Sequence, residues 1–219
     1  MTTRTIQPDS MTPEETYRLL SGVVVPRPIA WVASRSGDGV MNLAPFSCFT
    51  FVSNAPPMIG INVGRKGAAL KDTGNNIHET GEFVVHIADE TLIEPVHHSA
   101  AEHPPHVDEA GLLQLDTIPS LHVRVPRLIA PPIALECELH AATAYGETGS
   151  EFIVGIVRAF HVREDLLTDG KIDTALLAPI ARLGGPLYAG LGPITRMTPV
   201  GQTPKATLPS SADIGKATS

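Results

Sequence analysis

Two short turn signals between long apolar runs constrain the fold of this chain more than any other feature. Residues 36–39 read Ser-Gly-Asp-Gly, and residues 146–150 read Gly-Glu-Thr-Gly-Ser. Turns of this composition join neighbouring antiparallel strands. The runs on either side are rich in branched and aromatic residues, which favour strands. The chain is therefore predicted to be mainly β with helical additions, as in a β-barrel, rather than alternating β/α.

The same kind of pattern predicts further strands and a few helices. Strands are expected at residues 23–25, 29–33, 40–52, 58–63, 82–88, 121–125, 133–145, 151–162 and near 171–172. A helix should begin at Pro13, because Thr12 suits the N-cap and acidic residues follow; Gly22 should end it. Two more helices are expected at 67–80, ended by Gly81, and at 92–101, and residues 103–119 read as irregular.

The chain has 219 residues, which suits one domain with a substantial core. Residues 1–12 look like an irregular arm, and residues 13–197 form the predicted domain. Residues 198–219 contain almost no large apolar side chain and are predicted to be a mobile tail.

Composition and charge exclude several classes of function. The net charge is −7 and the only basic cluster is the pair Arg65-Lys66, so binding to nucleic acid or to an anionic membrane is not expected. No apolar run is long enough to span a membrane and no signal pattern opens the chain, which predicts a cytoplasmic protein. The two cysteines, Cys48 and Cys137, have neither disulfide nor zinc-site spacing. Four histidines between His97 and His106 match no metal-site spacing, so no metal site is predicted.

Four small polar clusters interrupt the strand-like sequence between residues 27 and 73. They read Arg-Pro-Ile-Ala-Trp-Val-Ala-Ser at 27–34, Asn-Leu-Ala-Pro-Phe-Ser at 42–47, Ser-Asn-Ala-Pro-Pro at 53–57 and Lys-Asp-Thr at 71–73. Each places hydroxyl, amide or cationic groups at the end of an apolar run, where the rim of a barrel would carry a ligand. Any one cluster has a structural explanation as well. Asn42 could form hydrogen bonds with backbone groups at a turn, and Lys71 and Asp72 could lie on a solvated helix face.

Taken together, the clusters resemble the flavin reductase-like family, whose members hold FMN on a split β-barrel; the first cluster looks closest to its flavoredoxin-like branch. FMN needs hydroxyls, N–H groups and a cation for its phosphate, and an apolar slot with a few donors for its ring. Candidates for the phosphate and ribityl chain are Ser34, Arg35, Ser36, Lys71 and Thr73, and candidates for the ring are Asn42, Ala44, Pro45, Ser47, Cys48 and Phe49. The resemblance adds Trp31 and Asp72 from the same clusters, and Tyr188 from a glycine-containing segment near the C-terminus.

The resemblance implies an NAD(P)H:flavin oxidoreductase that transfers a hydride from NADH or NADPH to N5 of FMN, with FAD also possible. It implies a homodimer that supplies reduced flavin or electrons to a partner such as a monooxygenase. Hydride transfer needs alignment more than a strong acid or base, so no catalytic residue is assigned. Two alternatives stay open: a flavoredoxin-like protein that keeps its FMN and transfers electrons, and a non-catalytic flavin-binding module.

Overall fold

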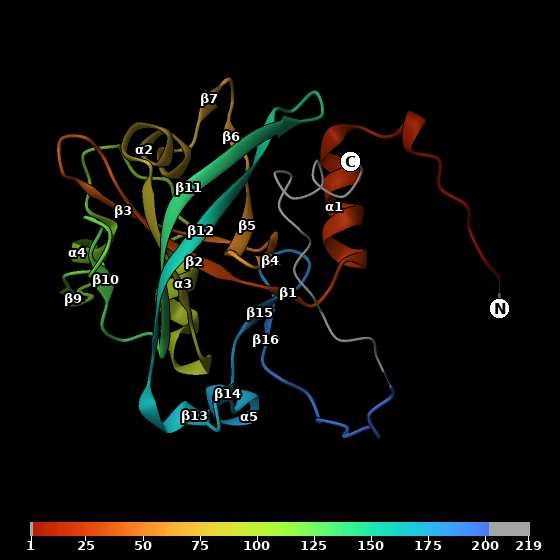
Figure 1. Cartoon of the computed structure of the whole chain (residues 1–219). Helices are drawn as coiled ribbons and strands as arrows, with labels where there is room; N and C mark the ends of the chain where they lie inside the picture. Colours follow the sequence, from red (N-terminus) through yellow and green to blue (C-terminus); the bar gives the residue numbers. More distant parts are fainter. Residues whose placement is uncertain (1, 202–219) are drawn as a thin grey trace, which may run out of the picture.

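The computed structural model describes residues 2–201 of the chain. Its centre is one seven-stranded sheet in which every neighbouring pair is antiparallel (Figure 1). In spatial order the strands are β3 (Met41–Phe46), β2 (Ala30–Arg35), β8 (Glu82–Ile87), β11 (Ile133–Tyr145), β12 (Ser150–Val162), β5 (Pro57–Val63) and β4 (Phe49–Asn54). The mainly β fold is confirmed, and so are both predicted hairpin turns, β2–β3 and β11–β12.

The sheet closes into a barrel at a corner formed by two residues. The outermost strands, β3 and β4, are consecutive in the chain, and only Ser47 and Cys48 lie between them. The backbone N–H of Asn62, on β5, donates to the carbonyl of Cys48 at 2.9 Å. Strands at opposite ends of the order are therefore joined covalently, which requires the sheet to curl. The single strand expected at 40–52 is wrong, because this corner divides it.

Alternate residues of the central strands enter two separate cores. Val32 and Val85 belong to the barrel interior, together with Ile61. Trp31 and Val84 point to the outer side, where α3 (Ile93–His98) and α4 (Glu109–Leu112) cover them. This arrangement explains why the first five residues of β2 are all buried, as is usual for a strand covered on both faces.

A buried histidine, His86 on β8, joins the two sides of the outer core. Its Nδ1 is 3.0 Å from the carbonyl of Trp31, and its Nε2 is 2.9 Å from the backbone N–H of Leu128. Because Nε2 must accept and Nδ1 must donate, the ring is neutral. Burial lowers the pKa of His86 to about 4.

We expect protonation of His86 to make the fold acid-sensitive. The unfolded chain takes up this proton near pH 6.5 and the folded protein only near pH 4, so stability falls as the pH drops through that window. Urea denaturation at several pH values in this range measures the effect. A His86→Gln variant keeps one donor and one acceptor and should have a flatter profile between pH 6.5 and 5, where few carboxylates titrate. An equally steep profile in that variant would assign the acid sensitivity to other groups.

The first helix begins as predicted but ends later. In α1 (Pro13–Val23) the Thr12 side chain accepts from the N–H of Glu15, whose carboxylate accepts from the Thr12 N–H. Gly22 lies inside the helix, so the strand expected at 23–25 is wrong. No residue of α1 is buried, and the helix stands beside the barrel in Figure 1.

The second helix is shorter than predicted. Residues 65–70 form a small hairpin of β6 (Arg65–Lys66) and β7 (Ala69–Leu70), with Gly67 at φ 60°. This positive φ cannot continue into a helix, so α2 (Asp72–Thr80) starts only after Lys71. Gly81 ends it in the left-handed conformation, as expected.

The strand expected at 121–125 is absent because carboxylates take its backbone donors. The N–H groups of Leu121 and His122 donate to Glu136 at 2.8 and 2.6 Å, and the N–H of Arg124 donates to Glu82 at 2.8 Å. With these three N–H groups bonded to side chains, the segment lacks the donors for a regular ladder with a neighbouring strand.

Short elements complete the described part of the chain. They are η1 (Pro8–Ser10), β1 (Arg27–Pro28), η2 (Glu90–Leu92), β9 (Thr117–Ile118), β10 (Arg127–Leu128), η3 (Glu164–Leu166), β13 (Leu167–Thr168), β14 (Lys171–Ile172), α5 (Thr174–Leu177), β15 (Ala181–Arg182) and β16 (Tyr188–Ala189). The helix expected at 92–101 is limited to α3, and the irregular stretch 103–119 contains α4 and β9. Most of the predicted tail, residues 202–219, lies outside the described residues. Within residues 2–201, no helix has the length and apolar character needed to cross a membrane.

Candidate functional site

Arg27 fixes the barrel corner to the segments around it. Its buried guanidinium donates to Ser47 Oγ at 3.2 Å, to the carbonyl of Val24 at 2.8 Å and to the carbonyl of Leu183 at 2.9 Å. It also donates to the carbonyl of Ser21. One side chain therefore positions the end of α1, the corner and the C-terminal segment, and its donors are already engaged.

A cleft of about 590 Å³ runs along this corner; we call it the corner cleft. The apolar side of α1 and the residues of the corner line it, together with the cationic side chains of Arg65 and Lys71. Its lining residues are Tyr17, Leu20, Ser21, Val24, Arg27, Pro45, Phe46, Ser47, Cys48, Asn62, Gly64, Arg65, Lys71 and Ser150. The exposed thiol of Cys48 opens into it.

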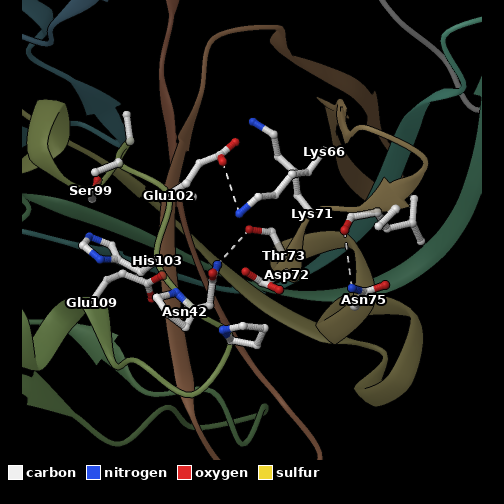
Figure 2. A pocket seen from close by; sticks show the side chains of 17 residues that line it. Asn42, Lys66, Lys71, Asp72, Thr73, Asn75, Ser99, Glu102, His103 and Glu109 are labelled. Carbon is white, nitrogen blue, oxygen red and sulfur yellow. Dashed lines mark hydrogen bonds and ion pairs between the residues drawn. The ribbon is translucent and has the colours of Figure 1, made fainter.

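A second cleft, also about 590 Å³, continues from Lys71 between β3, α2 and the loop 99–105; we call it the amide cleft (Figure 2). An ion pair of 3.1 Å between Lys66 and Glu102 connects the β6–β7 hairpin to that loop. The amide cleft is lined by Asn42, Ala44, Lys66, Ala69–Thr73, Asn75, Ser99–Pro105 and Glu109. Because Lys71 lines both clefts, the two form one continuous surface.

A buried polar network holds the start of α2 against β2 and β3. Asn42 Nδ2 donates to Thr73 Oγ1 at 2.8 Å and lies 3.5 Å from Ser34 Oγ. Asn76 Nδ2 donates to the same Ser34 hydroxyl at 3.1 Å. The four side chains are all buried, so they satisfy one another and fix the position of the helix N-terminus.

The N-terminus of α2 is open to an anion. Lys71 is the N-cap residue, and no side chain caps the helix. The Lys71 ammonium is exposed and has no hydrogen bond or ion pair within residues 2–201, while Asp72 supplies the opposing charge nearby. A free cation beside uncapped N–H groups at a helix N-terminus is a suitable environment for a phosphate.

Glu109 is a functional candidate that the sequence pattern did not reveal. Asp108-Glu109 reads as a loop, but Asp108 caps α4 and Glu109 is buried in the wall of the amide cleft. Its Oε2 accepts from the N–H of Leu43 at 3.2 Å. Burial raises the pKa of Glu109, which is partly offset by hydrogen bonds to backbone N–H groups. The sequence did contain one sign of this helix, because an acidic residue directly before a short apolar stretch is a typical N-cap pattern.

Tyr188 lies at a third, smaller cleft of about 300 Å³, the tyrosine cleft. Its hydroxyl accepts from Arg182 at 2.6 Å and lies 3.2 Å from His97 Nδ1. The tyrosine cleft shares Arg27 and Ser47 with the corner cleft, so it borders the same surface.

The structure brings most of the predicted site residues together. Those that line the three adjoining clefts are Asn42, Ala44, Pro45, Ser47, Cys48, Lys71, Asp72, Thr73 and Tyr188. Ser34 lies behind them in the buried network. Phe49 packs against the barrel core and lines none of the three clefts.

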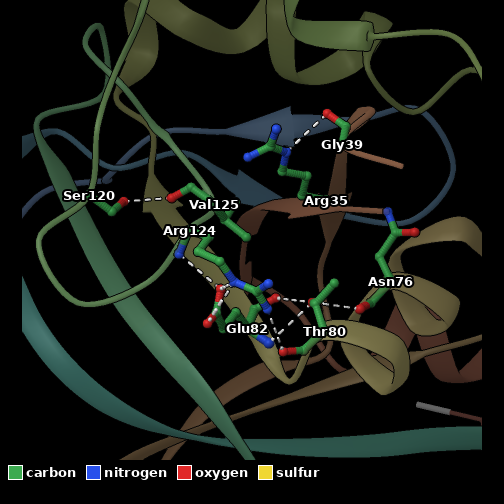
Figure 3. Close-up of polar contacts among 8 residues, drawn as sticks. All are labelled: Arg35, Gly39, Asn76, Thr80, Glu82, Ser120, Arg124 and Val125. Atoms are coloured by element: carbon green, nitrogen blue, oxygen red, sulfur yellow. Dashed lines mark hydrogen bonds and ion pairs between the residues drawn. The ribbon is translucent and has the colours of Figure 1, made fainter. Parts of the chain in front are cut away.

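Three predicted residues lie elsewhere. Trp31 is fully buried, and its indole N–H donates to Ser99 Oγ at 2.8 Å, so its ring belongs to the outer core. Arg35 and Ser36 line a separate pocket of about 220 Å³, which Arg124 also lines; Figure 3 shows Arg35 and Arg124. Arg35 donates to the carbonyl of Gly39 there, at 3.0 Å. We leave these three residues out of the candidate site.

The histidines do not form a metal centre in the described part of the chain. Within residues 2–201, no group of three or more His, Cys, Asp or Glu side chains is arranged to hold an ion. His97 instead contacts Tyr188, and His103 lines the amide cleft near Glu109.

A comparison with protein families identifies the fold and the class. The flavin reductase like domain matches residues 21–178, which is most of the chain. The protein belongs to the flavin reductase-like family. The match covers the corner, α2 and the barrel strands, so the three clefts are built largely from the family domain.

Solved structures agree with this assignment over nearly the whole chain. Nitrilotriacetate monooxygenase component B from Bacillus cereus has 39% identity and a TM-score of 0.87, covering 90% of this chain and 100% of its own. The 2-nitrobenzoate 2-nitroreductase of Pseudomonas fluorescens has 32% identity and a TM-score of 0.82; the match covers 93% of this chain and 100% of the nitroreductase. A Shewanella frigidimarina protein described as a flavin reductase with a split barrel domain has 17% identity and a TM-score of 0.77; the match covers 88% of this chain and 96% of that protein. That likeness concerns the fold alone, which is the predicted split barrel.

Proposed function

We propose that this protein is an NAD(P)H:flavin oxidoreductase that binds FMN in the corner and amide clefts. The observation that carries the proposal is the position of Lys71, which is exposed at the uncapped N-terminus of α2 and lines both clefts. A phosphate dianion needs a cation and N–H donors together, and Lys71 with the first turn of α2 offers both.

The remaining residues of the two clefts suit the other parts of FMN. Ala44 and Pro45 offer apolar walls for a planar ring, together with Leu20 of α1 and Val24, which directly follows that helix. The corner, which Arg27 holds rigid, offers backbone groups and the Ser47 hydroxyl at the ring edge. The two clefts together thus offer a cationic region for a phosphate and an apolar region for a ring, which is the combination that a flavin nucleotide requires.

Bound flavin would supply the redox chemistry, by accepting a hydride at N5 from NADH or NADPH and passing the electrons on. The protein's own part is to exclude water, to orient the two rings and to offer donors where negative charge develops. Glu109, with its raised pKa, could hold a proton at the wall of the amide cleft. The tyrosine cleft, with Arg182 and His97 at its edge, is the proposed entry for the nicotinamide nucleotide.

The relatives support a reductase that works with a partner. The Bacillus cereus protein is named as one component of a monooxygenase, and the Pseudomonas fluorescens protein is named as a nitroreductase. Both match this chain over their full length. We therefore propose that reduced flavin or electrons pass from this protein to a separate acceptor, such as a monooxygenase.

The test is a visible absorbance spectrum of the purified protein with added FMN, followed by NADH or NADPH without oxygen. Flavin bands that change on binding and then bleach rapidly are the expected result. Turnover that continues with excess free flavin supports the reductase. Tight retention of FMN with poor NAD(P)H turnover would favour a flavoredoxin-like electron carrier. Failure to bind FMN or FAD would leave a non-catalytic module.

We further propose that the protein is a homodimer, because the side of α1 that faces away from the clefts is also apolar. Tyr17, Leu20 and Val24 line the corner cleft. Leu19 and Val23 lie on another side of the helix and are 39% and 66% exposed. Phe51 on the outermost strand β4 is 75% exposed. A helix with no buried residue and an apolar edge strand are stabilised by a second copy of the chain.

Replacing Val23 with aspartate should convert the dimer into a monomer, because the new charge would be buried at the subunit contact. Light scattering after size-exclusion chromatography measures the mass. Leu176→Asp, at an exposed apolar position on α5, is the matched control and should remain dimeric. A monomeric wild-type protein, or a dimeric Val23→Asp variant, would contradict the proposed contact.

A further inference from the structure

A fourth cleft, of about 500 Å³, opens between β10 and the facing ends of β11 and β12; we call it the β10 cleft. Figure 1 shows β10 at the edge of the molecule away from α1. Its lining residues are Arg127–Pro132, Ala134 and Phe160–Arg163. It shares no lining residue with the three clefts of the candidate flavin site. The β10 cleft is therefore a separate surface from the proposed flavin site.

Arg127 is a cation without a partner in this cleft. Its Nε is buried and has no hydrogen-bond acceptor, and the guanidinium has no ion pair within residues 2–201. The guanidinium of every other arginine from Arg18 to Arg182 donates to at least one carbonyl or side chain. The terminal nitrogens of this half-buried guanidinium are not among the buried atoms and have no acceptor in the described chain, so they are free to pair with an anion in the cleft.

The other ionisable side chains that line the cleft already have partners. His161 Nε2 lies 2.6 Å from the buried carboxylate of Glu136. Arg163 pairs with Asp165 at 2.7 Å and lies 3.9 Å from Asp89. These carboxylates are not among the residues that line the cleft, so none of them is available to Arg127 within it. Arg127 is therefore the one ionisable side chain lining the cleft that has no partner in the described part of the chain.

The other walls of the cleft are apolar. Pro131, Pro132 and Ala134 line it, and the ring of Phe160 is 59% exposed beside them. An apolar wall next to a guanidinium suits a molecule with a charged oxyanion at one end and an apolar body at the other.

We propose that the β10 cleft binds a small organic anion whose carboxylate or phosphate pairs with Arg127 while its apolar body lies on Phe160. The site is independent of the proposed flavin chemistry, since it shares no residue with the flavin clefts. A guanidinium donates two parallel hydrogen bonds to either head group, and the structure does not favour one of them.

The test is isothermal titration of the full-length protein with two probes that share a ring, benzoate and phenyl phosphate. At least one should bind the wild-type protein, and the tighter of the two identifies the head group. Arg127→Gln should weaken that binding by about tenfold or more, because a charge-assisted contact is lost. Arg124→Gln, an exposed arginine three positions away that pairs with Glu82, is the control and should bind as the wild type does. Binding of neither probe, or equal binding by Arg127→Gln, would overturn the proposal.

A second variant tests the apolar part without touching the cation. Phe160→Ala should weaken binding of the ring-bearing probe, and an unchanged affinity would contradict the role of the aromatic wall. The mass of Arg127→Gln in solution should equal that of the wild type. A change in its oligomeric state would overturn the proposal, because it would assign Arg127 to a subunit contact. FMN binding by these variants should stay at the wild-type level, so failure here is separable from failure of the proposed flavin site.

Discussion

Replacing Glu136 with alanine should lower the free energy of unfolding by about 3–5 kcal/mol. Glu136 is fully buried on β11 and accepts from the N–H groups of Leu121 and His122 and from His161. Burial raises the pKa of Glu136, but these donors outweigh it and hold the pKa below its usual value. Alanine would leave the two backbone donors and the imidazole without an acceptor, and it would release the segment 121–125 from the barrel.

Urea denaturation followed by circular dichroism measures this loss. The matched control is Glu138→Ala, two positions later on β11, where the carboxylate is exposed and pairs with Arg158 at 2.6 Å. An exposed pair contributes less than about 1 kcal/mol, so this variant should unfold close to the wild type. Equal losses in the two variants would mean that burial of Glu136 does not determine its contribution.

Replacing Lys71 with alanine should weaken FMN binding by about 1.5–3 kcal/mol, which is roughly 10- to 150-fold in Kd. The reason is the loss of a charge-assisted contact with the phosphate at the N-terminus of α2. Because the Lys71 side chain is exposed and makes no hydrogen bond or ion pair in the described chain, the free energy of unfolding should not change. Titration of the apoprotein with FMN, followed by absorbance, measures the affinity.

Lys171→Ala is the control for Lys71→Ala, since Lys171 is an exposed lysine on β14 and lines none of the clefts of the site. It should bind FMN as the wild type does. If Lys71→Ala also binds normally, the phosphate does not lie at α2 and the proposed orientation of the flavin is wrong. If both variants bind FMN weakly to the same degree, the effect comes from overall charge rather than from a contact.

The sequence pattern predicted the strands of the barrel well where local turns and periodicity decide the structure. The hairpins at 36–39 and 146–150 formed as expected, because their turn residues suit the connection they make. The pattern failed at the barrel corner, where an apolar run continues through Ser47 and Cys48 while the backbone turns. The polar cluster at 42–47 ends there, but it does not by itself predict a break between strands; Arg27, twenty positions earlier in the chain, holds the corner.

The same holds for the candidate site: features that depend on local sequence were predicted, and features that depend on contacts between distant segments were not. The clusters around Asn42 and Lys71 were found from the sequence, and the structure brings them to one surface. Trp31 lies in the outer core and lines none of the three clefts, which the sequence could not show because a strand buried on both faces does not reveal which side faces a cleft. Glu109 was missed because its burial depends on contacts with β3, more than sixty positions earlier.

The single tryptophan of this chain has a practical consequence for all of these measurements. Trp31 is the only indole among 219 residues, and its N–H is bonded to Ser99, which lines the amide cleft. Its fluorescence therefore comes from one known position, without any label. Emission should shift to longer wavelength when the outer core opens to water, and a bound flavin should quench it by accepting the excitation energy. One optical signal could thus follow both unfolding and cofactor binding in the unmodified protein.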